Sequence, residues 1–102
     1  MTDKQTISWI FLATALATNT KPTDMDGISS LADGINHAVP THKELQTSIA
    51  WLTKHGLIVK QGKNYELTDK GKIEYETASK HTDKLLEIWK VLEKHLNSYG
   101  DN

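Results

Sequence analysis

Residues 45–71 read LQTSIAWLTKHGLIVKQGKNYELTDKG, and the clearest structural signals of the chain lie in this stretch. Leu45, Ile49 and Leu52 recur at helical spacing, so its first part predicts a helix with one apolar face. Gly56 should end this helix, because glycine adopts the left-handed conformation at a helix C-terminus without steric cost.

A β-hairpin is predicted directly after this helix. The runs 57–59 and 65–67 flank the residues Gln-Gly-Lys-Asn at 61–64, which is a strand–turn–strand pattern. The side chain of Thr68 can then cap a following helix. The stretch therefore predicts a helix, a hairpin and a second helix start within 27 residues.

The start of the first of these helices carries a capping box, Thr41-His42-Lys43-Glu44. In such a box the threonine hydroxyl and the glutamate carboxylate satisfy two backbone amides reciprocally, which places the helix at about 42–55. Apolar residues at helical spacing predict two earlier helices, at 6–18 and 25–36. The short link at 37–40 makes the second and third helices typical of a helix-turn-helix.

The C-terminal part predicts one long helix, from about Asp69 to Asn97. Ala78, Leu85 and Leu92 continue a seven-residue apolar repeat that is typical of a coiled-coil seam. At ~1.5 Å per residue such a helix is about 40 Å long, too long to be buried on so small a domain. We therefore expect a folded domain at 1–72 and a dimerisation element at 73–102.

The surplus apolar surface of the first and last helices favours a homodimer. The alternative is that the last helix folds back over the first helix, with a break near residues 79–82. The side chains expected at the dimer interface are Trp9, Phe11, Leu85, Ile88, Trp89, Leu92 and Leu96.

The composition of the 102 residues excludes several classes of protein. There is no cysteine, so disulfides, thiolate metal sites and cysteine nucleophiles are excluded. The most apolar run, residues 7–17, has 11 residues, whereas a membrane-spanning helix needs about 20. No signal-peptide pattern accompanies it, so we expect a cytoplasmic protein with no membrane partner.

No motif indicates catalysis, a metal or a cofactor. The five histidines include no pair four residues apart on one helix, and no HExxH motif occurs. A GxSxG motif, a phosphate-binding loop and a dinucleotide fingerprint are also missing. We therefore expect a protein that is not an enzyme and that holds no metal or cofactor, and no small-molecule effector can be named.

Charge is unevenly distributed along the chain. The formal net charge is −1, but residues 41–72 carry six lysines against three acidic residues, and both flanking parts are net negative. A local basic patch, rather than the total charge, determines how a protein meets DNA. All twelve basic residues are lysine, so the bidentate arginine contact to guanine is excluded.

The outer face of the third helix is the candidate DNA-binding surface. When its apolar residues face inward, small and polar side chains face outward and can enter a major groove closely. The helix N-terminus favours a phosphate, and the hairpin lysines can reach the flanking backbone or minor groove. The side chains expected to contact DNA are Thr41, His42, Lys43, Gln46, Thr47, Lys54, Lys60 and Lys63.

An ordinary solvated surface is the alternative interpretation of this outer face. Trp51 lies about 120° from the centre of the apolar face by the same helical geometry. We expect it to pack on a neighbouring helix rather than to meet a partner chain or a ligand.

Residues 25–75 resemble the winged helix-turn-helix of MarR-like and PadR-like transcriptional regulators. The resemblance rests on Glu44-Leu45, Ile49, Leu52, His55-Gly56-Leu57-Ile58 and Tyr65-Glu66-Leu67-Thr68-Asp69-Lys70-Gly71. It implies an α+β, mostly α fold with a three-helix core, a two-stranded β wing and a long C-terminal helix. It also implies a homodimeric transcriptional regulator with helix 42–55 in the major groove of double-stranded DNA. Because a fold does not determine a function, the alternative is a protein-interaction module on the same scaffold.

Overall fold

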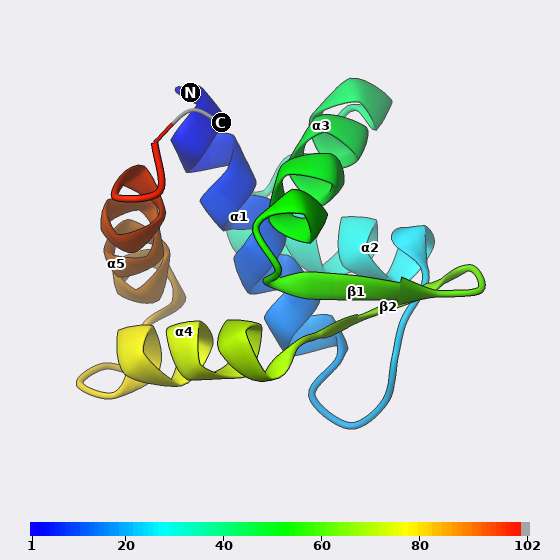
Figure 1. The fold of residues 1–102 in the computed structure, drawn as a ribbon. Helices are drawn as coiled ribbons and strands as arrows, with labels where there is room; N and C mark the ends of the chain where they lie inside the picture. Colours follow the sequence, from blue (N-terminus) through cyan, green and yellow to red (C-terminus); the bar gives the residue numbers. More distant parts are fainter. Residues whose placement is uncertain (101–102) are drawn as a thin grey trace.

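The computed structural model describes residues 1–100, and these form five helices and one two-stranded antiparallel sheet (Figure 1). The fold is therefore α+β and mostly helical, as the sequence predicts. The elements are α1 (Asp3–Ala17), α2 (Met25–Asn36), α3 (His42–Lys54), β1 (Ile58–Gln61), β2 (Asn64–Leu67), α4 (Asp69–Ser79) and α5 (Leu85–Asn97).

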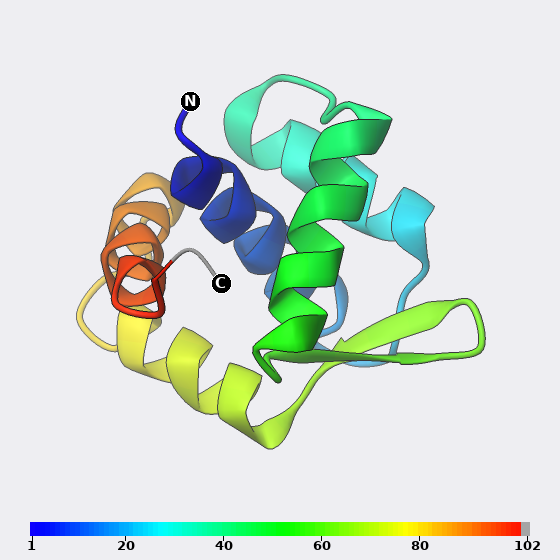
Figure 2. The same cartoon turned by 45° about the horizontal axis from the view of Figure 1, so that its top comes forward.

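Helix α1 lies at the centre of the molecule and contacts α2, α3, α4, α5 and β2 (Figures 1 and 2). Ten of its fifteen residues are buried, because apolar side chains occur on nearly every side of the helix. Its buried hydroxyl groups bond to the backbone of the preceding turn. Ser8 Oγ donates to the Lys4 carbonyl at 2.7 Å, and Thr14 Oγ1 donates to the Ile10 carbonyl at 2.8 Å. Neither hydroxyl is therefore left unpaired in the core.

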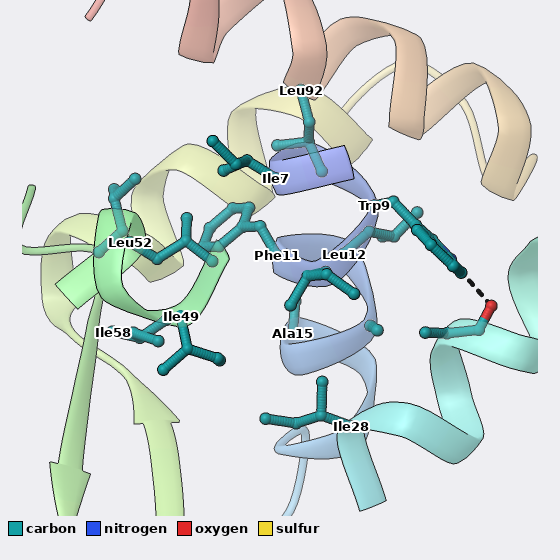
Figure 3. Packing of buried hydrophobic residues seen from close by; sticks show 14 of the residues in the cluster. Ile7, Trp9, Phe11, Leu12, Ala15, Ile28, Ile49, Leu52, Ile58 and Leu92 are labelled. Carbon is teal, nitrogen blue, oxygen red and sulfur yellow. Dashed lines mark hydrogen bonds between the residues drawn. The ribbon is translucent and has the colours of Figure 1, made fainter. Parts of the chain in front are cut away.

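The hydrophobic core gathers around α1 and takes side chains from all the other elements (Figure 3). Leu52 of α3, Ile58 of β1 and Leu92 of α5 are almost completely buried. Trp9 Nε1 donates to the Ala32 carbonyl of α2 at 2.8 Å, the dashed line in Figure 3. This bond satisfies the one polar atom of the largest core side chain.

The prediction of one long helix over residues 69–97 is wrong, because the chain breaks it into α4 and α5 at residues 80–84. Within this polar segment the Thr82 hydroxyl accepts a hydrogen bond from the Lys84 amide at 3.1 Å, a local bond that competes with helix formation. Helix α5 folds back onto α1, which is the alternative that the sequence left open. The expected boundary after residue 72 falls inside α4, and both sides of it contribute to one core.

Most side chains expected at a dimer interface lie inside the monomer instead. Trp89 stacks on Trp9 with ring centroids 6.2 Å apart and donates Nε1 to the Gln5 carbonyl at 2.9 Å. Of the seven, Leu85 alone is classed as exposed, at 38%. The fold-back buries most of the apolar surface of both helices within one chain, and Leu85 and Leu86 of α5 remain exposed. The expected interface residues that are at most 3% exposed are Trp9, Phe11, Ile88, Leu92 and Leu96.

The hairpin is tighter than the sequence predicts. Ile58 lies opposite Leu67 and Gln61 opposite Asn64, so the turn consists of residues 62 and 63 alone. Gly62 has φ +64°, and a two-residue hairpin turn requires such positive values. On the other edge of β2, the Thr23 amide donates to the Tyr65 carbonyl at 3.0 Å and the Tyr65 amide donates to the Thr23 carbonyl at 2.7 Å. This bridge ties the hairpin to the α1–α2 connection.

Thr68 joins the end of α3, the hairpin and the start of α4. Its hydroxyl accepts a hydrogen bond from the Gly71 amide at 3.0 Å, which confirms the predicted cap, and donates to the Gly56 carbonyl. Gly71 lies so close to the Leu57 carbonyl oxygen that a Cβ atom at this position would collide with it. The pattern Leu-Thr-x-x-Gly therefore has a physical basis, because only glycine permits this approach of two backbones.

Replacement of Leu92 by alanine should lower the free energy of unfolding by about 2–5 kcal/mol, because the side chain is fully buried. The urea midpoint of both proteins should be independent of protein concentration, since the contacts of α5 lie within one chain. Leu86→Ala is the control, because Leu86 is 59% exposed on the same helix and its truncation should change little. A midpoint that rises with protein concentration would show that α5 is buried between chains.

Replacement of Gly71 by alanine should destabilise the protein by about 1–3 kcal/mol, because the Leu57 backbone must move to admit the methyl group. The matched control is Gly34→Ala within α2, where no atom lies near the added methyl group. That change should stabilise by about 0.5–1 kcal/mol, since alanine is the better helix former. Urea unfolding of both variants measures the two effects. A Gly71→Ala protein as stable as the parent would show that the Gly71 backbone does not lie against the Leu57 carbonyl oxygen.

Candidate nucleic-acid interface

The caps of α3 determine where the helix begins and ends. Thr41 Oγ1 accepts a hydrogen bond from the Glu44 amide at 3.0 Å, and Glu44 Oε1 accepts one from the Thr41 amide at 2.8 Å. The predicted capping box is therefore confirmed. At the other end Gly56 has φ +73°, and the Leu57 amide donates to the Leu52 carbonyl at 2.9 Å. Since both ends are held, the direction of each side chain along α3 is determined as well.

The inner face of α3 is the one that the sequence predicts. Leu45, Ile49 and Leu52 are buried in the core. The opposite face presents Thr47, Ala50 and Lys54 to solvent, and Gln46 is exposed to one side of it. No large apolar or aromatic group projects from the centre of this outer face.

All eight side chains expected to contact DNA are exposed. The hairpin projects from the body of the protein beside the C-terminal end of α3, so its turn extends away from the core (Figures 1 and 2). The structure therefore brings two groups to the surface, one on the helix and one on the hairpin. The first group is Thr41, His42, Lys43, Gln46, Thr47 and Lys54, and the second is Lys60 and Lys63.

The lysines of this surface differ in what surrounds them. Lys60 Nζ lies over the ring of Tyr65, 5.7 Å from its centroid, so its ammonium is held against the hairpin. Within residues 1–100, no ion pair or cation–π contact engages Lys43, Lys54 or Lys63. Their charges are therefore available to a negatively charged partner.

Trp51 packs against other parts of the chain, as the sequence predicts. Its ring centroid lies 4.1 Å from that of His55 and 5.7 Å from that of Tyr99, which follows α5. Lys4 Nζ lies 5.2 Å from the Trp51 ring centroid and also donates to the Gly100 carbonyl at 2.6 Å. This cluster joins the middle of α3 to both ends of the described chain. Sequence patterns within a single helix could not have indicated it.

A second polar cluster lies where α4 meets the end of α5. Tyr99 Oη donates to Glu74 Oε2 at 3.2 Å, and His95 Nδ1 lies 2.9 Å from Glu74 Oε1. Burial and the neighbouring Glu74 carboxylate raise the pKa of Tyr99 above its ordinary value of 10.0. The phenol therefore remains a protonated hydrogen-bond donor at neutral pH. The arrangement joins two helices and contains no activated nucleophile.

Residues 1–100 are the described part of the chain. It contains no group of three or more histidine, cysteine, aspartate or glutamate side chains that could hold a metal ion. None of its helices combines the length and the apolar character that crossing a membrane requires. Comparisons of the chain with protein-family models, curated proteins and solved structures find no match.

Proposed function

We propose that the protein binds duplex DNA through α3 and the hairpin, as a DNA-binding transcriptional regulator of the winged-helix type. The observation that carries the proposal is the exposed outer face of α3, which is small and polar and lies between unpaired lysines. The order of the elements supports it, since α2 and α3 correspond to a helix-turn-helix and the hairpin to a wing. In this proposal the regulator acts as a homodimer, and each chain contributes one such surface.

The N-terminal half of α3 is the part suited to a major groove. Thr41 and His42 lie where the first backbone amides of the helix attract a phosphate. Gln46 can donate and accept hydrogen bonds, and such a side chain can form a bidentate pair with adenine. Thr47 and Ala50 are small enough to let the helix backbone approach the bases. Specific contacts would therefore come from a few short side chains.

The lysines would contribute affinity rather than specificity. Lys63 lies in the hairpin turn and Lys60 lies on β1, both positioned for the phosphate backbone beside the groove. Lys43 and Lys54 lie near the two ends of α3. A lysine–phosphate contact does not depend on the base, and it releases bound counterions. We therefore expect modest affinity with a clear dependence on salt.

Fluorescence anisotropy of a labelled mixed-sequence duplex tests the proposal. At low salt we expect saturable binding, and four lysine contacts predict a slope of about −3 to −4 for log K against log salt concentration. The double variant Lys43→Glu/Lys63→Glu should bind at least tenfold more weakly, because two attractive charges become repulsive. No binding by the folded protein at tens of micromolar would exclude DNA as the partner and favour a protein-interaction module.

The matched control is Lys80→Glu/Lys90→Glu, which changes the net charge equally. Both lysines are exposed and belong to the α4–α5 region, on the opposite side of the fold from the hairpin (Figure 1). This variant should retain most of the affinity. Equal weakening by the two double variants would show that only the total charge matters and would contradict a defined binding face.

A further inference from the structure

A cleft of about 500 Å³ lies between the first turns of α1 and α3. Met1 and Ile7 give it apolar walls, and Ser48 and Trp51 of α3 line it as well. A volume of this size accommodates a small molecule, and a mainly apolar wall with a few polar groups is typical of such sites. The cleft adjoins the outer face of α3, because Lys43 and Thr47 belong to both.

Ser48 lines this cleft with a hydroxyl that has no partner. Its side chain is 1% exposed, and its Oγ atom forms no hydrogen bond among the described residues. Other helical hydroxyls behave differently. Those of Ser8, Thr14 and Thr53 each donate to the carbonyl four residues earlier, at 2.7–2.8 Å. Ser48 does not use this bond, although its position in α3 would permit it.

Trp51 lines the same cleft and differs from the other two tryptophans in the hydrogen bonding of its indole N–H. Trp9 Nε1 donates to the Ala32 carbonyl at 2.8 Å, and Trp89 Nε1 donates to the Gln5 carbonyl at 2.9 Å. The Nε1 atom of Trp51 is buried and has no partner within residues 1–100. Contacts with His55 and Tyr99 hold the ring in place. Two unpaired polar atoms one helical turn apart are an uncommon arrangement, because buried polar groups are almost always bonded.

We infer that this cleft binds a small molecule with an apolar body and a carbonyl oxygen that accepts hydrogen bonds. The indole N–H can only donate, so the group that satisfies it must be an acceptor, and the Ser48 hydroxyl can donate to the same oxygen. Lys4 and Lys43 line the cleft together with Asp3 and Glu44, so its charges balance and the demand for an acceptor comes from the indole N–H alone. Both atoms are buried, so side chains at the cleft must move before the ligand can reach them. The inference does not depend on DNA binding.

The three indole N–H signals in a ¹H–¹⁵N spectrum test this inference, with Trp51→Phe used to assign the signal of Trp51. Acetophenone is the probe, since it joins a phenyl ring to one carbonyl acceptor. We expect it to shift the Trp51 signal at millimolar concentrations, while the already bonded indoles of Trp9 and Trp89 remain unshifted. Toluene, which has the same ring without an acceptor, should bind at least fivefold more weakly.

Two variants test the donors separately, with binding followed by the backbone amide of Thr47. Trp51→Phe should weaken acetophenone binding at least fivefold, and Ser48→Ala at least twofold. Ser48→Ala removes an unbonded hydroxyl and should therefore fold normally. Ser79→Ala, on α4, is the control and should bind as the parent does, because that hydroxyl already donates to the Tyr75 carbonyl.

Three results would overturn the inference. One is an unshifted Trp51 signal at about 20 mM acetophenone, a concentration well above the millimolar affinity of a ligand of this size. Another is an equal shift of all three indole signals, which would indicate binding without a site. The third is toluene binding as tightly as acetophenone, because an apolar pocket alone would then explain the result.

Discussion

The burial of α1 on most of its sides determines how the other elements are arranged. A helix with apolar residues around most of its circumference must be surrounded, and α2, α3, α4, α5 and β2 all contact it. Each of these elements therefore turns its apolar face inward and leaves a polar face outside. The outer face of α3 is one such polar face. The candidate binding surface is thus a consequence of how the core is filled.

The same constraint explains the path of the C-terminal part. The apolar face of α5 and the surplus apolar surface of α1 match each other, so one chain satisfies both. The two hydrogen bonds of the Thr68 hydroxyl, one of them with the Gly71 amide, then direct α4 away from the hairpin. The hairpin is left projecting beside α3 (Figure 2). Core packing and the candidate interface are therefore connected through backbone contacts at Gly56 and Leu57.

Local signals in the sequence predicted much of this fold. The capping box of α3, the glycine after it and the cap at Thr68 involve bonds between residues that are close in the sequence, so their patterns are readable without a structure. The exposure of the candidate DNA contacts on α3 follows from helical periodicity and is equally local. The Thr82–Lys84 bond is a local signal for the break at residues 80–84, but it does not decide alone between a break and one long helix. An apolar repeat can be buried by another chain or by α1, and only the tertiary fold decides between them. The cleft beside Trp51 escaped prediction for the same reason, because Ile7 and Ser48 meet only in the folded protein.

The most direct test of the central claim is a map of backbone amide shifts during titration of the protein with a mixed-sequence duplex at low salt. We expect the largest changes along the exposed side of α3 and at the hairpin turn, including Gln46, Thr47 and Lys63. The amides of α5 should remain unchanged. Changes centred on α4 and α5, or no changes at saturating duplex, would contradict the claim that this face binds DNA.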